Sequence, residues 1–251
     1  MLAFTIAGRE LRTLFLSPLA WSILGVIQIL LGYMFLAQLD YYLTLQPRIA
    51  GMEEAPGITD LIVVPLFANA GVILLLVTPL LTMRLISEER RNKTLSLLFT
   101  APVSMTEIIL GKYLGVFGFM LIMVALIATM PLSLLAGGSL DFGKLTACVL
   151  ALCLLLAGFA AIGLFISSLA AQPTVAAVST FGALLLLWII DWTGAAEGNT
   201  GTVLDYLSML RHYEALMKGL INTTDLAYFV LVILTFLVLS VHSLDNDRLQ
   251  K

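Results

Sequence analysis

The residues that could do chemistry in this chain are few, and the densest group of them is a run of charges, Glu88-Glu89-Arg90-Arg91-Asn92-Lys93. Long apolar segments lie on both sides of this run. Because charged side chains are costly to bury, we expect them to lie in water. A dense, mixed-charge surface of this kind is suited to contacting a soluble protein partner. The charged run is therefore the first candidate functional site.

The residues around this run predict a short helix over 88–100. Ser87 is a residue type that caps helix N-termini, and the two glutamates that follow it would place negative charge in the first turn, where it suits the helix dipole. Glu89 and Lys93 are four residues apart, in the order that stabilises a helix. Pro102 ends the predicted helix.

A capping box then predicts the start of the next helix, because Ser104 is followed three residues later by Glu107. A short capped helix at the membrane surface could transmit force from a soluble partner. The same residues also fit an ordinary solvated loop. The charge pattern alone leaves these two interpretations open.

Other reactive side chains do not form a recognisable catalytic group. The chain has two histidines, no His-Glu-x-x-His sequence and no glycine-rich phosphate loop ending in Lys-Ser or Lys-Thr, so we expect no metal site and no cofactor or nucleotide bound by this chain. Ser167, Ser168 and Thr129 are expected to bond to backbone rather than to act as nucleophiles. Cys148 and Cys153, five residues apart in one apolar run, point to different faces of a helix and are expected to be small apolar residues.

The composition places these groups in a membrane protein. Apolar residues make up 60% of the chain and charged residues 12%, whereas a soluble domain is nearer half and a quarter. Several apolar runs exceed the roughly 18 residues that indicate a membrane span. With a net charge of -3, nothing suggests a nucleic acid partner. We therefore predict an all-α membrane protein whose main contact is the lipid bilayer.

The pattern predicts one six-span domain over 1–251. An amphipathic helix over 1–16 is expected to lie in the membrane interface, and Ser17-Pro18 breaks it. A helical segment over 203–221 is too charged to span and is expected at the outer interface, as one helix or a broken pair. A loop over 40–60 and a polar tail over 242–251 complete the chain. The spans are predicted at 19–39, 61–86, 105–136, 142–168, 174–190 and 226–241.

Basic residues orient this arrangement, because they concentrate in cytoplasmic segments. If the N-terminus lies in the cytoplasm, more of the basic residues lie on the inner side of the membrane than on the outer side. This distribution predicts that both termini and the charged run are cytoplasmic. The inner set is Arg9, Arg12, Arg84, Arg90, Arg91, Lys93, Lys112, Arg248 and Lys251, and the outer set is Arg48, Lys144, Arg211 and Lys218.

No charged residue lies clearly in the middle of a predicted span. Ion-coupled carriers usually place carboxylates, lysine or histidine there, so this class is disfavoured. Asp191 lies at a span end beside Trp192 and is expected to mark the membrane boundary. A membrane body without an energy source, joined to a charged helix, fits a permease powered by a separate ATPase.

Two stretches resemble a known family. Residues 88–104 and the Gly111-Lys112 pair are similar to the signature of type-2 ABC exporter permeases, and within them to the gliding-motility (Gld-type) subfamily. Residues 213–229 are similar to that subfamily's segment before the last span. Asn92 stands where many relatives have a small residue. The resemblance extends over nearly the whole chain.

The resemblance implies a bacterial inner-membrane permease that pairs with a second permease copy above a dimer of ABC ATPase subunits. ATP and magnesium would bind in those partner chains, and a large periplasmic protein is a further expected partner. The helix over 88–100 would be the ATPase-coupling helix, 1–16 a connecting helix, and 203–221 outer re-entrant helices. The implied coupling residues are Glu88, Glu89, Arg90, Arg91, Lys93, Thr94, Leu95, Leu97, Leu98, Pro102 and Ser104, and the implied outer-gate residues are Leu207, Leu210, Tyr213 and Met217.

A second function stays open beside transport. The chain would then be a non-catalytic membrane anchor that transmits mechanical work to an extracytoplasmic partner without moving a substrate. The loop over 40–60 and the region 191–225 would carry the partner site in that case.

Overall fold

Long helices make up this structure because the chain is apolar enough to lie in lipid, where every backbone amide and carbonyl must be bonded within the chain. The computed structural model describes residues 2–49, 57–94, 103–136, 140–197, 206–219 and 222–249. Every regular element in these ranges is a helix, and six of the helical segments are long and apolar enough to cross a membrane. The all-α, six-span prediction is confirmed to that extent.

The first two helices are separated where the sequence predicts. α1 (Leu2–Leu16) ends at a bend on Ser17, and α2 (Pro18–Ile49) begins with a proline, which has no amide hydrogen to leave unbonded in the first turn. α2 is longer than the predicted span 19–39, and residues 40–49 are helical rather than part of a loop. The polar residues after Leu39 mark the edge of the apolar segment, but a helix can continue into water.

The second predicted span, 61–86, consists of several pieces. A π-helical turn η1 (Thr59–Val63) leads into α3 (Val64–Thr82), and a turn over 83–86 separates α3 from α4 (Ser87–Arg91). The remaining elements are α6 (Met105–Leu132), the 3₁₀ turn η2 (Ser133–Ala136), α7 (Phe142–Leu169), α8 (Pro173–Glu197), α10 (Met209–Met217) and α11 (Thr223–Leu249).

The helices α8 and α11 also extend beyond their predicted spans, 174–190 and 226–241. The tail predicted over 242–251 is helical as far as Leu249. In the predicted 203–221 segment, residues 206–207 are helical, Ser208 breaks the helix, and α10 follows. Part of that segment, residues 203–205 and 220–221, lies outside the described residues.

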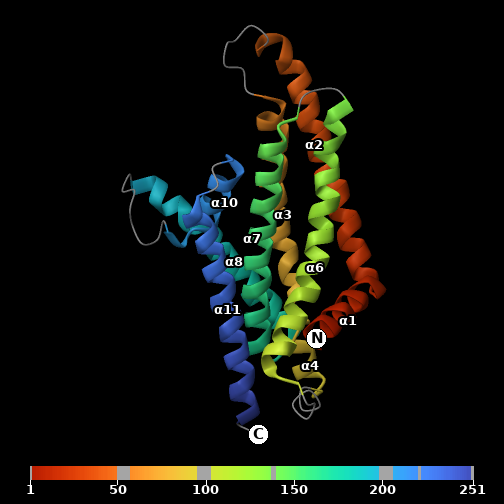
Figure 1. Ribbon diagram of the computed structural model, residues 1–251, viewed down its shortest axis with the longest axis vertical. Helices are drawn as coiled ribbons and strands as arrows, with labels where there is room; N and C mark the ends of the chain where they lie inside the picture. Colours follow the sequence, from red (N-terminus) through yellow and green to blue (C-terminus); the bar gives the residue numbers. More distant parts are fainter. Residues whose placement is uncertain are drawn as a thin grey trace.

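Both ends of the chain lie at the same end of the helical bundle as α4, here named the α4 end (Figure 1). The opposite end carries the outer part of α2, η1, η2 and the start of α7. α10 lies beside the opposite half of the bundle, between α8 and α11 (Figure 1). The two ends of the bundle are therefore separated by the length of the spans.

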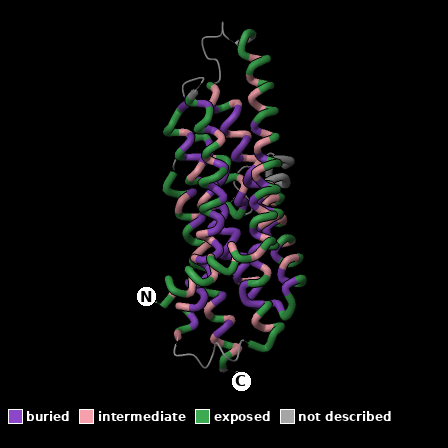
Figure 2. Tube along the Cα trace, turned by 90° about the vertical axis from the view of Figure 1, so that its right-hand side faces the viewer, coloured by how far each residue is buried: buried purple, intermediate pink, exposed green. Residues whose placement is uncertain are grey.

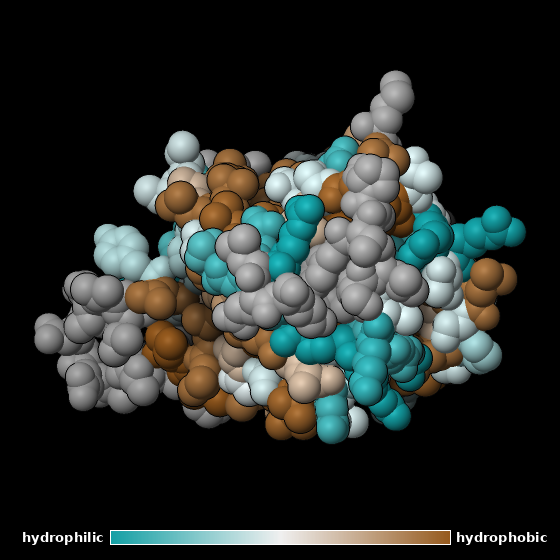
Figure 3. Space-filling model, turned by 90° about the horizontal axis from the view of Figure 1, so that it is seen from below, coloured by the Kyte–Doolittle hydropathy of each residue, from teal (hydrophilic) through white to brown (hydrophobic). Residues whose placement is uncertain are grey.

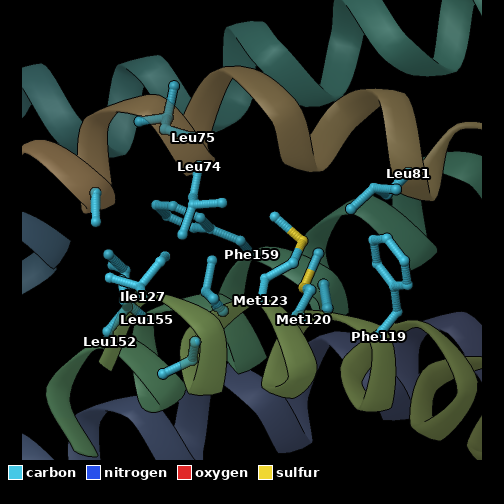
Figure 4. Packing of buried hydrophobic residues seen from close by; sticks show 14 of the residues in the cluster. Leu74, Leu75, Leu81, Phe119, Met120, Met123, Ile127, Leu152, Leu155 and Phe159 are labelled. Atoms are coloured by element: carbon cyan, nitrogen blue, oxygen red, sulfur yellow. The ribbon is translucent and has the colours of Figure 1, made fainter. Parts of the chain in front are cut away.

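α7 is the central helix, and it contacts α3, α6, α8, α10 and α11. Its core side chains interlock with those of α3 and α6, as Figure 4 shows for Leu74, Phe119, Met123, Leu155 and Phe159. The helices α2 and α11 are far more exposed along their length than α7. Figure 2 shows the buried residues inside the bundle and the exposed residues on its outside. Apolar faces directed away from the core are expected for helices that contact lipid.

Small residues allow α7 to approach its neighbours closely, as its composition predicts. A methyl group added at Gly163 would lie 2.3 Å from the hydroxyl oxygen of Thr82 on α3. Cβ atoms essentially never approach a non-bonded atom this closely. The end of α3 is therefore fixed against α7 just before the turn that leads to α4.

A candidate partner-docking site at the α4 end

The short helix α4 is attached to α7 through its first backbone amides. The hydroxyl oxygen of Ser167 on α7 accepts hydrogen bonds from the amides of Ile86 (3.1 Å) and Ser87 (3.2 Å). The same hydroxyl donates to the carbonyl of Met83 (3.2 Å). These amides at a helix start have no partner within the helix, so a side chain from a different helix satisfies them.

Ser87 does not cap this helix, and that prediction is wrong. The N-cap position is Ile86, one residue earlier, and the hydroxyl of Ser87 donates to the carbonyl of Met83 in the preceding turn. A serine inside a helical turn commonly bonds back in this way. The expectation that Ser167, Ser168 and Thr129 bond to backbone is confirmed, because Ser168 bonds to Phe165 and Thr129 to Leu126.

The C-terminus of α4 has a Schellman motif, which stops the helix at Arg91. The amide of Thr94 donates to the carbonyl of Glu89 (3.0 Å) and the amide of Lys93 to that of Arg90 (3.2 Å). Lys93 adopts a left-handed conformation with φ of 58°. The helix predicted over 88–100 therefore does not continue unbroken, because α4 ends at Arg91, and residues 95–100 lie outside the described residues.

The inner side of α4 carries a buried ionic bridge. Lys112 of α6 places its Nζ 2.8 Å from Oε1 of Glu89 and 2.9 Å from Oε1 of Glu10 on α1. Only 4% of the lysine side chain is exposed, which leaves it almost closed to water. A buried ammonium group needs such partners, because desolvation of a lone charge is expensive. The three side chains join α1, α4 and α6 at one point.

Arg90 joins α4 to two further helices. Its Nη2 donates to the carbonyl of Ser168 at the end of α7 (2.7 Å) and pairs with Asp247 of α11. Within the described part of the chain, Arg90 Nε and Glu89 Oε2 are buried without a hydrogen-bond partner. Glu89 and Arg90 therefore belong to the inner contacts of this protein, although the resemblance assigns both to the ATPase.

The outer side of α4 and its following turn remains exposed. Glu88, Arg91, Asn92, Lys93 and Thr94 are all exposed, and together they are named the docking face. Figure 3 shows hydrophilic side chains gathered on this end of the molecule. The exposed charges have both signs, which suits complementary contact with a protein surface.

The other implied coupling residues have mixed outcomes. Leu95, Leu97, Leu98 and Pro102 lie outside the described residues. Ser104 lies at the start of α6, and its capping box is confirmed, because its hydroxyl accepts from the amide of Glu107 (3.2 Å) and the Glu107 carboxylate accepts from the amide of Ser104 (3.3 Å).

On the opposite half of the bundle, the implied outer-gate residues do not share one environment. Tyr213 and Met217 of α10 are buried, Leu210 is half-buried and Leu207 is exposed. The phenol of Tyr213 donates to the carbonyl of Phe67 on α3 (2.6 Å). Burial raises the pKa of Tyr213 well above its ordinary value, so this phenol stays a hydrogen-bond donor at neutral pH. Two of the four residues therefore attach α10 to the core.

A histidine that sequence reasoning did not single out holds α10 against α11. His212 places its Nδ1 2.6 Å from Oδ1 of Asp225 and its Nε2 3.2 Å from the carbonyl oxygen of Tyr206. Its ring stacks on Tyr228 with a centroid distance of 4.1 Å. His212 and Asp225 are thirteen residues apart in the sequence, and this separation alone predicts no contact between them. Only the fold of α10 against α11 brings the pair together.

A cavity of about 780 Å³ lies at the opposite end of the bundle, between α2, η1, η2 and the start of α7. Its polar lining includes Tyr42 and Gln46 of α2, together with Asp60 and Lys144, which form an ion pair. No three His, Cys, Asp or Glu side chains in the described ranges are grouped so that they could hold a metal ion.

Comparisons with known proteins agree with this architecture. The family model described as ABC-2 family transporter protein matches residues 4–249, nearly the whole chain. In a search of curated proteins, none matches the chain. Proteins of this family are the membrane permeases of ABC transporters, and they rely on a separate ATPase subunit for hydrolysis.

The match covers every described helix from α1 to α11, including the docking face, the ionic bridge and α10. This multi-pass membrane protein thus belongs to the ABC-2 family of transporter proteins, as a non-catalytic permease component.

Proposed function

We propose that this chain is the permease of a bacterial inner-membrane ABC exporter and that its ATPase subunits bind the docking face. The observation that carries this proposal is the construction of α4. Its backbone is attached to α7 through Ser167, its inner side chains pair with α6, α7 and α11, and its outer side chains remain exposed. A segment built in this way passes a displacement of its outer surface to the membrane helices.

ATP and magnesium bind in the partner subunits under this proposal, and the chain itself binds no cofactor. ATP binding brings the two ATPase subunits together and moves α4 with the ends of α3 and α7. Because Gly163 fixes the end of α3 closely against α7, these ends move as one unit. The pathway for the substrate then opens between two permease copies.

The second permease copy is supported by the apolar faces that the chain leaves uncovered. Ile29 of α2, Val178 of α8 and Leu231 of α11 have exposed fractions of 72%, 72% and 63%. Lipid covers part of such surface, and a second copy of this chain covers the rest. We further place the protein in the gliding-motility subfamily, on residues 88–104 and 213–229, with a large periplasmic protein as an additional partner.

The orientation follows from the basic residues at the α4 end. Arg9, Arg12, Arg84, Arg91 and Lys93 gather there, while Lys144, Arg211 and Lys218 lie nearer the other end. The positive-inside rule then puts α4 and both termini in the cytoplasm, where an ATPase has access to ATP. α10 lies in the outer half of the membrane and closes the pathway from that side.

Co-purification of the permease with its ATPase tests the proposal. We expect the double variant Glu88→Lys with Arg91→Glu to abolish co-purification, because each reversed side chain would face a charge of its own sign on the ATPase. Lys218→Glu, a reversal after α10, is the matched control and should leave the complex intact. Retention of the ATPase by the double variant would contradict docking at this face.

The anchor function remains a second candidate, and the opposite end of the bundle favours it. α2 extends beyond the neighbouring helices (Figure 1), and the cavity beside it has the mixed polar and apolar lining of a protein-binding surface. In reconstituted complexes, stimulation of ATP hydrolysis by an extracytoplasmic protein alone favours the anchor. Stimulation by a transported compound favours the exporter.

A further inference from the structure

Lys112 is a charged residue whose position on α6 is almost closed to solvent, and its ammonium group bonds to one carboxylate from α4 and one from α1. We propose that Lys112 is a positioning residue that makes α1 follow α4, so that a displacement at the docking face also moves the N-terminal helix. This inference deepens the proposed function and rests on it for the source of the displacement.

The first argument is the type of bond. Lysine has three donor hydrogens on a flexible four-carbon stem, so one ammonium group can hold Glu10 and Glu89 together through small changes in geometry. If α4 moved away from Lys112, a carboxylate and an ammonium group would lose their partner in a place with little water. Breaking the bridge is therefore more costly than moving α1 with it.

The second argument is the contact between α1 and α6. Built methyl groups on Gly111 and Gly115 would lie 2.6 Å from Ile6 Cβ and from Glu10 Cβ. At these two positions α6 lies directly against α1, with no space for even one added methyl group. A pull on Glu10 therefore moves α1 as a body, rather than bending one side chain.

The third argument is the path on the other side of α4. Arg90 connects α4 to the ends of α7 and α11 through the Ser168 carbonyl and Asp247. Adjacent residues of one short helix thus hold two separate groups of helices, α1 with α6 and α7 with α11. A tilt of α4 acts on both groups at once, and Lys112 is the residue through which it acts on α1.

Distance measurements between spin labels test the link directly. One label replaces Phe4, an exposed residue of α1, and the other replaces Arg84, an exposed residue of the turn that leads into α4. Cys148 and Cys153 are first changed to alanine. In the parent protein we expect one narrow distance distribution that ATP does not change, both in the isolated permease and in its ATPase complex.

Lys112→Met keeps an unbranched side chain that is one atom shorter and removes the charge, and Lys112→Arg keeps the charge. We expect Lys112→Met to broaden the distribution in the isolated permease and to make it shift when ATP is added to the complex. The separate variant Lys112→Arg should show the same narrow distance distribution as the parent protein. Glu10→Gln and Glu89→Gln should give non-additive effects when combined, whereas Arg12→Gln, an exposed change on α1, should leave the distance unchanged.

The possible failures are separable. A narrow, ATP-independent distribution in Lys112→Met would overturn the inference, and so would an ATP-induced shift in the parent complex. If the parent permease does not bind the ATPase at all, the proposed function fails. The isolated permease still decides in that case whether Lys112 links α1 to α4.

Discussion

Lys112, near the start of α6, is the shared partner of Glu10 on α1 and Glu89 on α4, at 2.9 Å and 2.8 Å. Removing one partner from a buried ionic group typically costs about 3–5 kcal/mol, so this bridge has a large effect on the α4 end.

Ser167 is expected to stabilise the protein more than its neighbour Ser168. Ser167→Ala leaves the amides of Ile86 and Ser87 without their acceptor, at a cost of about 1–3 kcal/mol for each buried unsatisfied group. Ser168→Ala is the matched control, because that hydroxyl bonds within its own helix. Thermal unfolding in detergent should show a clearly lower midpoint for Ser167→Ala. Equal midpoints for the two variants would contradict this role.

Tyr213 is expected to hold α10 mainly by its ring. Tyr213→Phe removes one hydrogen bond to the Phe67 carbonyl and should lower the free energy of unfolding by about 1 kcal/mol. Tyr213→Ala also removes a fully buried ring and should cost about 3–5 kcal/mol. Denaturant unfolding of both variants separates the two contributions. A cost for Tyr213→Phe as large as that for Tyr213→Ala would show that the hydroxyl dominates.

At the scale of elements, the position of α1 depends on two glycines of α6. In Gly111→Ala the new methyl group would lie 2.6 Å from Ile6 Cβ and 2.9 Å from the Ala3 carbonyl oxygen, so α1 must move outward. Gly118→Ala is a control on the same helix, since its methyl group would meet Leu11 at an ordinary 3.8 Å.

The distance between two spin labels, one replacing the exposed Phe4 of α1 and one replacing the exposed Leu121 of α6, reports the position of α1. We expect Gly118→Ala to leave this distance unchanged and Gly111→Ala to lengthen it, in a background without Cys148 and Cys153. An unchanged distance in Gly111→Ala would mean that α1 tolerates the extra methyl group by local adjustment.

The elements also show where sequence patterns failed. The Ser104–Glu107 capping box and the break at Ser17 are local, so the sequence predicted both. The end of α4 at Arg91 depends on the left-handed conformation of Lys93, a residue type that does not favour it. The continuation of α2 to Ile49 was missed because polar residues mark the end of the apolar segment, which is not the end of the helix.

At the scale of the whole molecule, the orientation in the membrane can be tested with two single cysteines. Asn246→Cys lies in the exposed end of α11 and Lys218→Cys in the exposed turn after α10. In intact cells we expect a membrane-impermeant maleimide to label Lys218→Cys and to label Asn246→Cys only after the cells are opened. The reverse pattern would place α4 outside and remove the access of an ATPase to it.

The number of chains in the assembled permease is a second whole-molecule test. Native mass spectrometry of the permease released from membranes with its ATPase should give two copies of each subunit, because the rest of the chain leaves the outer faces of α2 and α8 uncovered. A complex with one permease copy would contradict the proposed dimer. It would also require the substrate pathway to run through a single bundle.

The sequence by itself determined the class of this protein. The backbone amides and carbonyls of long apolar runs can all be hydrogen-bonded in lipid only if the runs form helices. The charged run at Glu88 marks a surface in water. Its resemblance to ABC exporter permeases agrees with the family match. These conclusions depend on composition and on local patterns, which are the properties that a linear sequence carries.

Only the tertiary structure decided which charges face inward. Glu89 and Arg90 are indistinguishable from Glu88 and Arg91 in the sequence, yet the first pair binds Lys112 and Asp247 and the second pair is exposed. Their partners lie on α6 and α11, 23 and 157 residues away from them. Contacts over such separations depend on how the helices pack, and packing around the glycines of α6 and α7 is set by shape rather than by any periodic pattern.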